Sequence, residues 1–200
     1  MSTVENESAL QPFEATTRLF TIADLEELPT DLPSGPIDYE LDNGRLVFIM
    51  VPPGDIHGAV QVNIATQLKV QGDFQGHGKT RTEVGVILWR DPDRVVTPDV
   101  LFIATKSLPL RRSREGYLET IPELIVEVRS RNDSLRYVER KAEHYLKAGV
   151  EVVWVVDPAA KTVAVHTSQG VSVVFGETDT LELPSLVPSF SLPVADIFID

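Results

Sequence analysis

The stretch LIVEVRSRNDSLRYVERKAEHYLKAGVEVVWVVD, residues 124–157, decides the fold. It opens with a nearly continuous apolar run at 124–128, typical of a strand buried on both faces of a sheet. A helix is expected to begin at Asp133 or Ser134 and to end at about Ala148, with Gly149 as its C-cap. A second buried strand follows at 150–156. This βαβ unit predicts two parallel strands joined by a right-handed crossover.

Shorter elements are expected on the N-terminal side of this unit. Thr21 and Asp24 resemble a capping box for a short helix that ends before Pro29. Asn43-Gly44 suits a tight turn between strands at 39–41 and 45–50. Asp55 is expected to cap a helix of about fifteen residues, whose apolar stripe is Ile56, Val60, Ile64 and Leu68.

The remaining strands complete a mixed sheet. Strands are expected at 82–89 and 95–103, as partners in a hairpin, and later at 162–166 and 171–175. The tail from Leu181 to Asp200 is apolar and interrupted by prolines, and it is expected to cover one edge of the sheet. The fold class is therefore α/β, with a mixed β-sheet flanked by two main helices and extra C-terminal strands.

Composition limits the functional classes. A chain of 200 residues predicts a single domain at 19–200 after a flexible arm at 1–18. The absence of cysteine excludes a disulfide scaffold, a zinc ribbon, an iron–sulfur cluster and a cysteine nucleophile, and it suits the cytoplasm, where we expect the protein. The longest apolar runs are too short to span a membrane, so no membrane partner is expected.

Charge is unevenly distributed along the chain. The formal net charge is −12, which argues against binding nucleic acid by bulk charge alone. Residues 111–147 nevertheless contain nine Lys or Arg against seven Asp or Glu, including RRSR at 111–114. This basic strip is either a solvated helix face and loop, or a surface that faces phosphate groups.

Three acidic residues stand in or at the ends of expected core strands: Asp99, Glu127 and Asp157. A buried carboxylate is costly unless it is paired, hydrogen-bonded or bound to a metal. Asp157 precedes a proline and is typical of a turn. For Asp99 and Glu127 the choice is between a buried salt bridge and a functional site.

Alternation along the strand places Arg129 on the same side as Glu127, and the next helix presents Lys141, His144 and Tyr145 on one side. Two carboxylates and a cation are the groups that hold a hard divalent cation and activate a water. Glu40 and Glu83 are further candidates, or surface carboxylates at strand ends. His57 is a further ligand candidate, or a local hydrogen-bonding residue. No phosphate loop, HExxH, GxSxG or GxGxxG motif occurs.

Several phrases, in this order, resemble the Uma-type family of putative restriction endonucleases, a branch of the PD-(D/E)XK nuclease superfamily. The resemblance runs from Tyr39 to Phe198. The phrases are YELDNGRL, PPGDIHGAVQVNIATQL, EVGVILWRDPDRVVTPDVLFI, GYLETIPELIVEVRSRND, VERKAEHYLKAGVEVVWVVDPAAKTVAVH and the closing LVPSFSLPVADIF.

The resemblance implies a restriction-endonuclease-like fold with Asp99 as the Asp of PD and Glu127 as the acid of (D/E)XK. Arg129 stands where the Lys is expected, so the resemblance assigns that role to Lys141, with Arg129 as the runner-up. Glu40 matches a family acid that joins the metal site, and Glu83 and His57 fall on family positions of less defined role. The loop Ser130-Arg131-Asn132-Asp133 lacks the proline that the family often has there.

The implied function is a magnesium-dependent endonuclease that hydrolyses DNA to 5′-phosphate and 3′-hydroxyl ends. Asp99, Glu127 and Glu40 would hold Mg²⁺, for which Mn²⁺ could substitute, and Lys141 would act on the attacking water. A homodimer is a further expectation from the resemblance. The alternatives are an inactive nuclease-fold module, in which Glu127 pairs with Arg129 or Arg140, and an enzyme for RNA or branched DNA, with Trp89 or Tyr117 as stacking residues.

Overall fold

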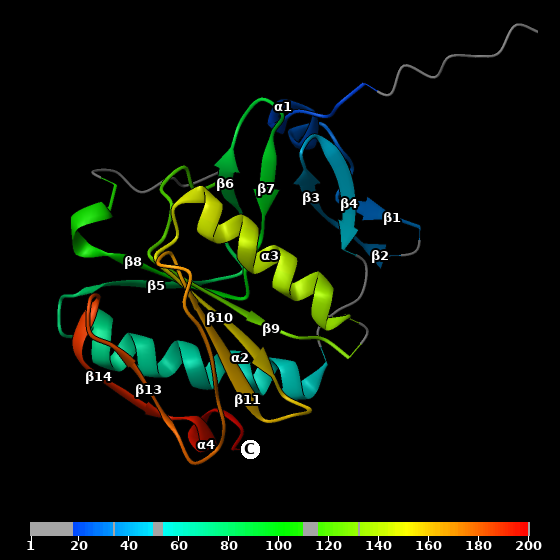
Figure 1. Cartoon of the computed structure of the whole chain (residues 1–200). Helices are drawn as coiled ribbons and strands as arrows, with labels where there is room; N and C mark the ends of the chain where they lie inside the picture. Colours follow the sequence, from blue (N-terminus) through cyan, green and yellow to red (C-terminus); the bar gives the residue numbers. More distant parts are fainter. Residues whose placement is uncertain (1–17, 34, 50–53, 110–115, 132, 200) are drawn as a thin grey trace, which may run out of the picture.

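The structure is a computed structural model that describes residues 18–33, 35–49, 54–109, 116–131 and 133–199. Its centre is a six-stranded sheet with the order β12-β11-β10-β9-β8-β5 (Figure 1). Strands β9 and β10 are parallel and are joined through helix α3, as the βαβ pattern predicts, and the other neighbours are antiparallel. The elements are β5 (Gly78–Thr82), β8 (Val100–Ala104), β9 (Leu124–Val128), α3 (Leu135–Ala148), β10 (Val152–Asp157), β11 (Thr162–Thr167) and β12 (Ser172–Phe175).

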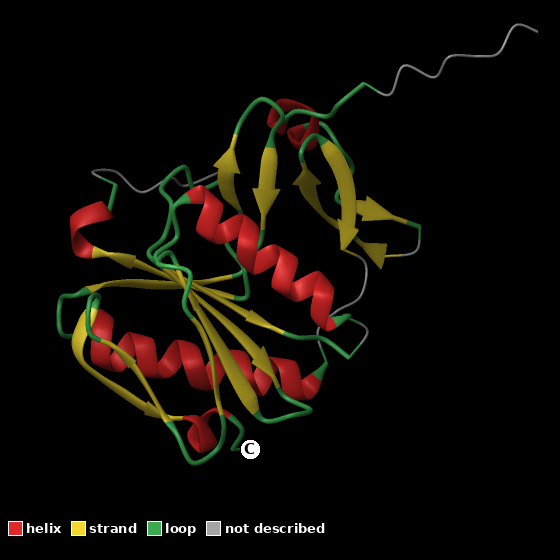
Figure 2. Cartoon of the chain, viewed as in Figure 1, coloured by secondary structure: helices red, strands yellow, loops and turns green. Residues whose placement is uncertain are grey.

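One helix covers each face of the central sheet (Figure 2). Helix α2 (Asp55–Leu68) buries Val60, Ile64 and Leu68 against one face, where Phe102 and Trp154 meet it. Helix α3 buries Val138, Ala142 and Tyr145 against the other face, where the sheet presents residues such as Leu101, Ile125 and Val153. Alternate side chains of each strand therefore pack into two separate hydrophobic cores, one on each face of the sheet.

The C-terminal segment corrects one expectation. It forms a hairpin of β13 (Thr180–Leu183) and β14 (Val187–Pro193), followed by α4 (Val194–Ile197). Its buried side chains, such as Leu181, Phe190 and Leu192, join the core on the α2 face. The tail thus packs on a face of the sheet rather than along an edge, because alternate residues of both strands are apolar and need a broad apolar surface.

A second, smaller sheet has the order β4-β3-β7-β6. It packs against α1 (Ile22–Glu26), whose predicted capping box is present: Thr21 accepts from the Asp24 N–H, and the Asp24 side chain accepts from the Thr21 N–H. The predicted turn is confirmed by positive φ at Asn43 (51°) and Gly44 (75°). The elements are β1 (Asp31–Leu32) and β2 (Gly35–Pro36), which pair with each other, and β3 (Asp38–Asp42), β4 (Arg45–Ile49), β6 (Val86–Trp89) and β7 (Arg94–Val96).

Each of the two strands expected at 82–89 and 95–103 is instead a pair of strands. The first breaks at residues 83–85, where Glu83 has a φ of 53°, and the second breaks around Pro98, which has no N–H to continue a ladder. The chain therefore crosses between the two sheets twice. Because Thr82 pairs with Val100, these crossings place Glu83 and Asp99 at the same junction.

Smaller corrections concern the helix ends. The N-cap of α2 is Gly54, not Asp55, and Ile56 is 65% exposed, so the buried stripe begins only at Val60. A π-helical turn, η1 (Lys69–Asp73), extends α2, and a 3₁₀ turn, η2 (Thr105–Ser107), follows β8. The expected caps of α3 are confirmed at Ser134 and Gly149. The expected arm up to residue 17 and RRSR lie outside the described residues. Within the described chain, no helix has the length and apolarity needed to cross a membrane.

Candidate active site at the junction of the two sheets

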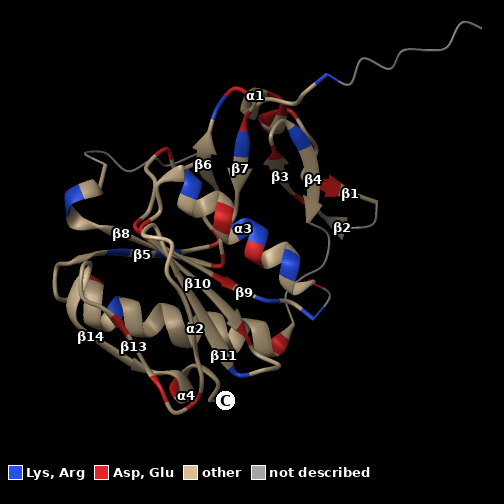
Figure 3. Ribbon diagram, in the orientation of Figure 1, with Lys and Arg blue, Asp and Glu red and all other residues tan. Residues whose placement is uncertain are grey.

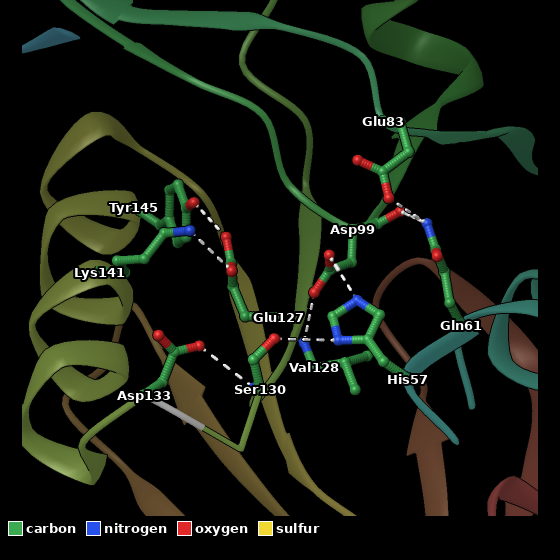
Figure 4. Close-up of polar contacts among 10 residues, drawn as sticks. All are labelled: His57, Gln61, Glu83, Asp99, Glu127, Val128, Ser130, Asp133, Lys141 and Tyr145. Carbon is green, nitrogen blue, oxygen red and sulfur yellow. Dashed lines mark hydrogen bonds and ion pairs between the residues drawn. The ribbon is translucent and has the colours of Figure 1, made fainter. Parts of the chain in front are cut away.

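Asp99 and Glu127 are brought together by neighbouring strands of the central sheet. Asp99 directly precedes β8 and Glu127 lies near the end of β9, where Val100 pairs with Val126. The Val128 N–H donates to Asp99 Oδ2 at 2.6 Å, which ties the loop before β8 to the end of β9 (Figure 4). The two carboxylates that were expected to act together thus share one end of the β8–β9 pair.

Asp99 is also held by His57, from the first turn of α2. The His57 Nε2 lies 3.0 Å from Asp99 Oδ1, and the Ser130 Oγ lies 3.4 Å from His57 Nδ1. The hydrogen bond to Asp99 raises the pKa of His57. The Nε2–H donates to the Asp99 carboxylate, and Nδ1 accepts from or donates to Ser130 according to whether the imidazole is neutral or protonated. His57 and the Val128 N–H therefore each hold one oxygen of the Asp99 carboxylate (Figure 4).

Glu127 is buried on the α3 side of the sheet. Lys141 Nζ donates to Glu127 Oε2 at 2.8 Å, and the Tyr145 hydroxyl donates to Glu127 Oε1. Burial raises the pKa of Glu127 to about 7, against the lowering influence of the Lys141 charge. Burial alone would lower the pKa of Lys141, but the neighbouring Glu127 carboxylate raises it well above its usual value. The pair thus holds a charged ammonium beside a carboxylate that readily binds a proton.

Arg129 is directed to another acid. Its Nη1 lies 2.6 Å from Asp157 Oδ2, and its Nε donates to the Asp133 carbonyl at 3.0 Å. Asp157 also accepts from the N–H groups of Ala159 and Ala160, as a turn-forming aspartate does. The structure therefore places Lys141, and not Arg129 or Arg140, against Glu127. Glu127 is thus half of a buried ion pair, as considered, but its cation is Lys141 rather than either arginine.

Glu83 is linked to the site by Gln61, a residue that the sequence did not identify as a candidate. Gln61, one turn after His57 on α2, donates from Nε2 to Glu83 Oε1 at 2.7 Å and to the Asp99 carbonyl at 2.9 Å. Burial raises the pKa of Glu83. A signal for Gln61 was available, because position i+4 from a candidate histidine lies on the same helix face. Tyr145 was placed beside Lys141 by the same spacing, but its contact with Glu127 was not foreseen.

Glu40 lies apart from this cluster. It is 6% exposed on β3, and its Oε1 accepts from the Thr97 N–H at 2.8 Å. It lines a small cavity together with Lys141, on the side of Lys141 away from the hydrogen-bonded cluster around Asp99. Among the described residues no group of three or more His, Cys, Asp or Glu side chains is arranged to hold a metal. This conformation therefore does not assemble the expected set of three carboxylates.

Asp99 and Glu127, at the same end of the β8–β9 pair, have oxygen atoms of the kind that a hard cation prefers. Each oxygen of Asp99 and Glu127 accepts one hydrogen bond from a described residue. An ionised carboxylate has about four acceptor positions, so both groups keep free lone pairs. Mg²⁺ is commonly bound by one or two carboxylates, with waters and substrate phosphates as the other ligands. The chemistry of the Asp99 and Glu127 side chains is thus compatible with a hard cation.

The two aromatic candidates for base stacking are half-buried and already have neighbours against their rings. Trp89 has the charged ends of Arg94 and Lys147 each 5.4 Å from its ring centroid, and it meets His144 edge-on. Tyr117 packs so closely on Gly85 that a Cβ there would lie 2.5 Å from its ring. Neither ring is arranged as a platform for a nucleic-acid base.

Comparison with known proteins agrees with this architecture. The sequence profile of Uma2, described as a putative restriction endonuclease, matches residues 22–195. The fold is similar to the crystal structure of a putative nuclease belonging to DUF820 from Anabaena variabilis, with a TM-score of 0.71 and 23% identity, over 90% of this chain and 97% of that one. No curated protein matches the chain. Because the profile spans most of the sequence, the chain belongs to the Uma2 family of putative restriction endonucleases.

Proposed function

We propose that the protein is a metal-dependent endonuclease that hydrolyses phosphodiester bonds in DNA. The observation that carries the proposal is the buried Glu127–Lys141 pair beside Asp99, at the junction of the two sheets. Membership of a family of putative restriction endonucleases supports the reaction class. A carboxylate pair with a fixed ammonium is the arrangement that phosphodiester hydrolysis needs, because negative charge grows on the phosphoryl oxygens.

Asp99 and Glu127 would hold Mg²⁺, or Mn²⁺ in its place. When bound, such an ion polarises the phosphoryl group and lowers the pKa of a coordinated water. His57 and the Val128 N–H hold Asp99 in place, and Tyr145 does the same for Glu127. Each carboxylate is thus oriented before substrate arrives, which saves the cost of ordering it during the reaction.

Lys141 acts as a charge and not as a base. Its pKa is raised by Glu127, so the ammonium stays protonated at neutral pH and has donors to spare for a second partner. Lys141 would donate to a phosphoryl oxygen or to the attacking water while it still holds Glu127. Arg129 is an unsuitable substitute because its guanidinium is already bound to Asp157 and the Asp133 carbonyl.

One observation favours an inactive nuclease-fold module as the second candidate. Every oxygen of Asp99 and Glu127 already has a protein donor, and Glu40 lies outside the cluster. A site that is satisfied internally can be retained for stability alone.

Metal binding and cleavage separate the two candidates. Mn²⁺ is titrated by calorimetry into the wild type, into Asp99→Asn and into the control Glu123→Gln. The control removes a carboxylate that is also buried but lies away from the site. Binding is expected in the wild type and in Glu123→Gln, and it should disappear in Asp99→Asn. The same proteins are then incubated with supercoiled plasmid and Mg²⁺. Absence of both binding and nicking in the wild type would favour the inactive module.

A further inference from the structure

A cavity of about 80 Å³ lies between α3 and the small sheet, next to the proposed site. Its walls include Glu40 and Asp42 from β3, Arg94 from β7, and Arg140, Lys141 and His144 from α3. Lys141 borders the cavity and also binds Glu127. A group bound in the cavity would therefore lie one side chain away from the proposed catalytic carboxylates.

Two residues that line the cavity each have a buried side-chain nitrogen without a partner among the described residues. Arg94 is only 6% exposed, and its Nε has no acceptor in the described part of the chain, although its Nη1 is paired with Asp42. The Nδ1 of His144 is also buried without a described partner. An unpaired buried Arg94 Nε costs about 1–3 kcal/mol, so a small movement of this side chain towards an acceptor in the cavity would be favoured.

The charge balance in the cavity favours an anion at its rim. Asp42 is neutralised by Arg94, Lys141 is paired with Glu127, and Glu40 accepts a backbone N–H. Arg140 is exposed, and no described acidic side chain forms an ion pair with it. Figure 3 shows basic positions along α3, in a protein whose net charge is −12. The positive charge and the N–H donors of Arg140 are therefore available to a ligand.

We propose that this cavity is a phosphate subsite for the substrate strand, with Arg140 at its rim and Arg94 within it. The inference rests on the proposed function, since it assigns a second phosphate to the strand that is hydrolysed at Asp99 and Glu127. The cavity has room for an oxyanion, since about 10–15 Å³ of such volume already holds one water. Guanidinium groups bind phosphate through paired donors. The site would therefore require a polynucleotide with neighbouring phosphates and would not bind a lone phosphomonoester well.

The test measures binding without chemistry. Anisotropy of a fluorescein-labelled DNA duplex of about 20 base pairs is followed in EDTA at several salt concentrations, because phosphate contacts appear in the salt dependence. The variants are Arg140→Gln, Arg140→Lys and the matched control Arg136→Gln. Arg136 is exposed one turn earlier on α3, but it does not line the cavity. Both glutamine variants lose one positive charge from the same helix.

Arg140→Gln should weaken binding and reduce the slope of log K against log salt by about one. Arg136→Gln should leave the slope unchanged, and Arg140→Lys should restore it. Equal slopes for the two glutamine variants, or no binding by the wild type, would overturn the subsite. Plasmid cleavage in Mg²⁺ is scored separately. A slope change without cleavage refutes the hydrolase and keeps the subsite, whereas an Arg140→Gln variant that binds and cleaves like wild type refutes only the subsite.

Discussion

Two buried glutamates lie four residues apart, Glu123 directly before β9 and Glu127 near its end, and they differ in their partners. Glu123 is 5% exposed and accepts from the Ala104 N–H and the Ser107 hydroxyl, with the exposed Lys106 4.0 Å away. Glu127 is 6% exposed and accepts from Lys141 and Tyr145, both on α3. Because its donors are a backbone N–H and a hydroxyl group at the two ends of the η2 turn, Glu123 stabilises that turn.

The environment of Glu127 serves a different purpose. Burial raises its pKa to about 7, and the facing cation belongs to a helix rather than to the local turn. A carboxylate that is costly to keep ionised, and that lies beside a second carboxylate, is typical of a functional site. The partner set, rather than burial itself, therefore distinguishes the two glutamates.

The largest difference between substitutions of the two glutamates is expected in the rate of plasmid nicking. Glu127→Gln should lower the rate of plasmid nicking per folded molecule by at least about a thousandfold, because it removes a metal-binding carboxylate. Glu123→Gln should leave the rate per folded molecule nearly unchanged. The measurement is cleavage at a temperature where circular dichroism shows both variants folded. Equal losses of rate would remove the functional distinction between the two residues.

The free energy of unfolding should fall in both variants, but the size of the fall should depend on pH differently. Glu127→Gln should cost about 3–5 kcal/mol at neutral pH, because Lys141 is left buried without its counter-charge. Glu123→Gln should cost about 1–3 kcal/mol, since a carboxamide cannot accept both hydrogen bonds as well. Urea unfolding at several pH values checks this. The cost of Glu127→Gln should shrink at high pH, where the unpaired Lys141 can lose its proton, and that of Glu123→Gln should stay constant.

The pH dependence of metal binding should report on Glu127. Its pKa is about 7, so below this pH the carboxyl group is protonated and competes poorly for Mn²⁺. The affinity should therefore fall by up to about tenfold per unit as the pH drops below 7. His57, whose pKa is also raised, acts in the same direction through Asp99. A His57→Gln control isolates the part due to Glu127, and a flat profile between pH 6 and 8 in that control would contradict the assignment.

Tyr145 should shift this pH profile. Tyr145→Phe removes the hydroxyl that donates to Glu127 and helps to lower its pKa. The midpoint for Mn²⁺ binding should therefore move to higher pH by about one unit, since a hydrogen bond to a charged group is worth about 1.5–3 kcal/mol. Tyr117→Phe is the matched control, because the Tyr117 hydroxyl donates to no described residue. A loss of stability without a shifted midpoint would make Tyr145 merely a packing residue.

The smallest effect is expected at Arg129. Arg129→Gln breaks a partly exposed pair with Asp157, whose side chains are 29% and 16% exposed. Exposure and solvent screening limit the cost to about 1 kcal/mol, and the cleavage rate should stay close to that of the wild type. A loss of activity as large as that of Lys141→Gln would instead assign the role of the motif lysine to Arg129.

Much of the fold could be predicted from local patterns. The apolar run at 124–128, the caps at Ser134 and Gly149, and the Asn43-Gly44 turn each act within a few residues, and all three are confirmed. The family and the mixed sheet are likewise confirmed. The splitting of the strands around Glu83 and Pro98 was missed, because a run of apolar residues does not reveal which sheet each half joins.

The sequence by itself determined the parallel βαβ unit, the two helices and the identity of the acids that interrupt apolar strands. It could do so because caps, turns and periodicity are properties of neighbouring residues. Only the tertiary structure decided which cation meets which acid. Arg129 is two residues from Glu127 but binds Asp157, whereas Lys141 reaches Glu127 from a helix fourteen residues on. Pairing across layers depends on how a helix docks on the sheet, and that docking is set by the buried core as a whole.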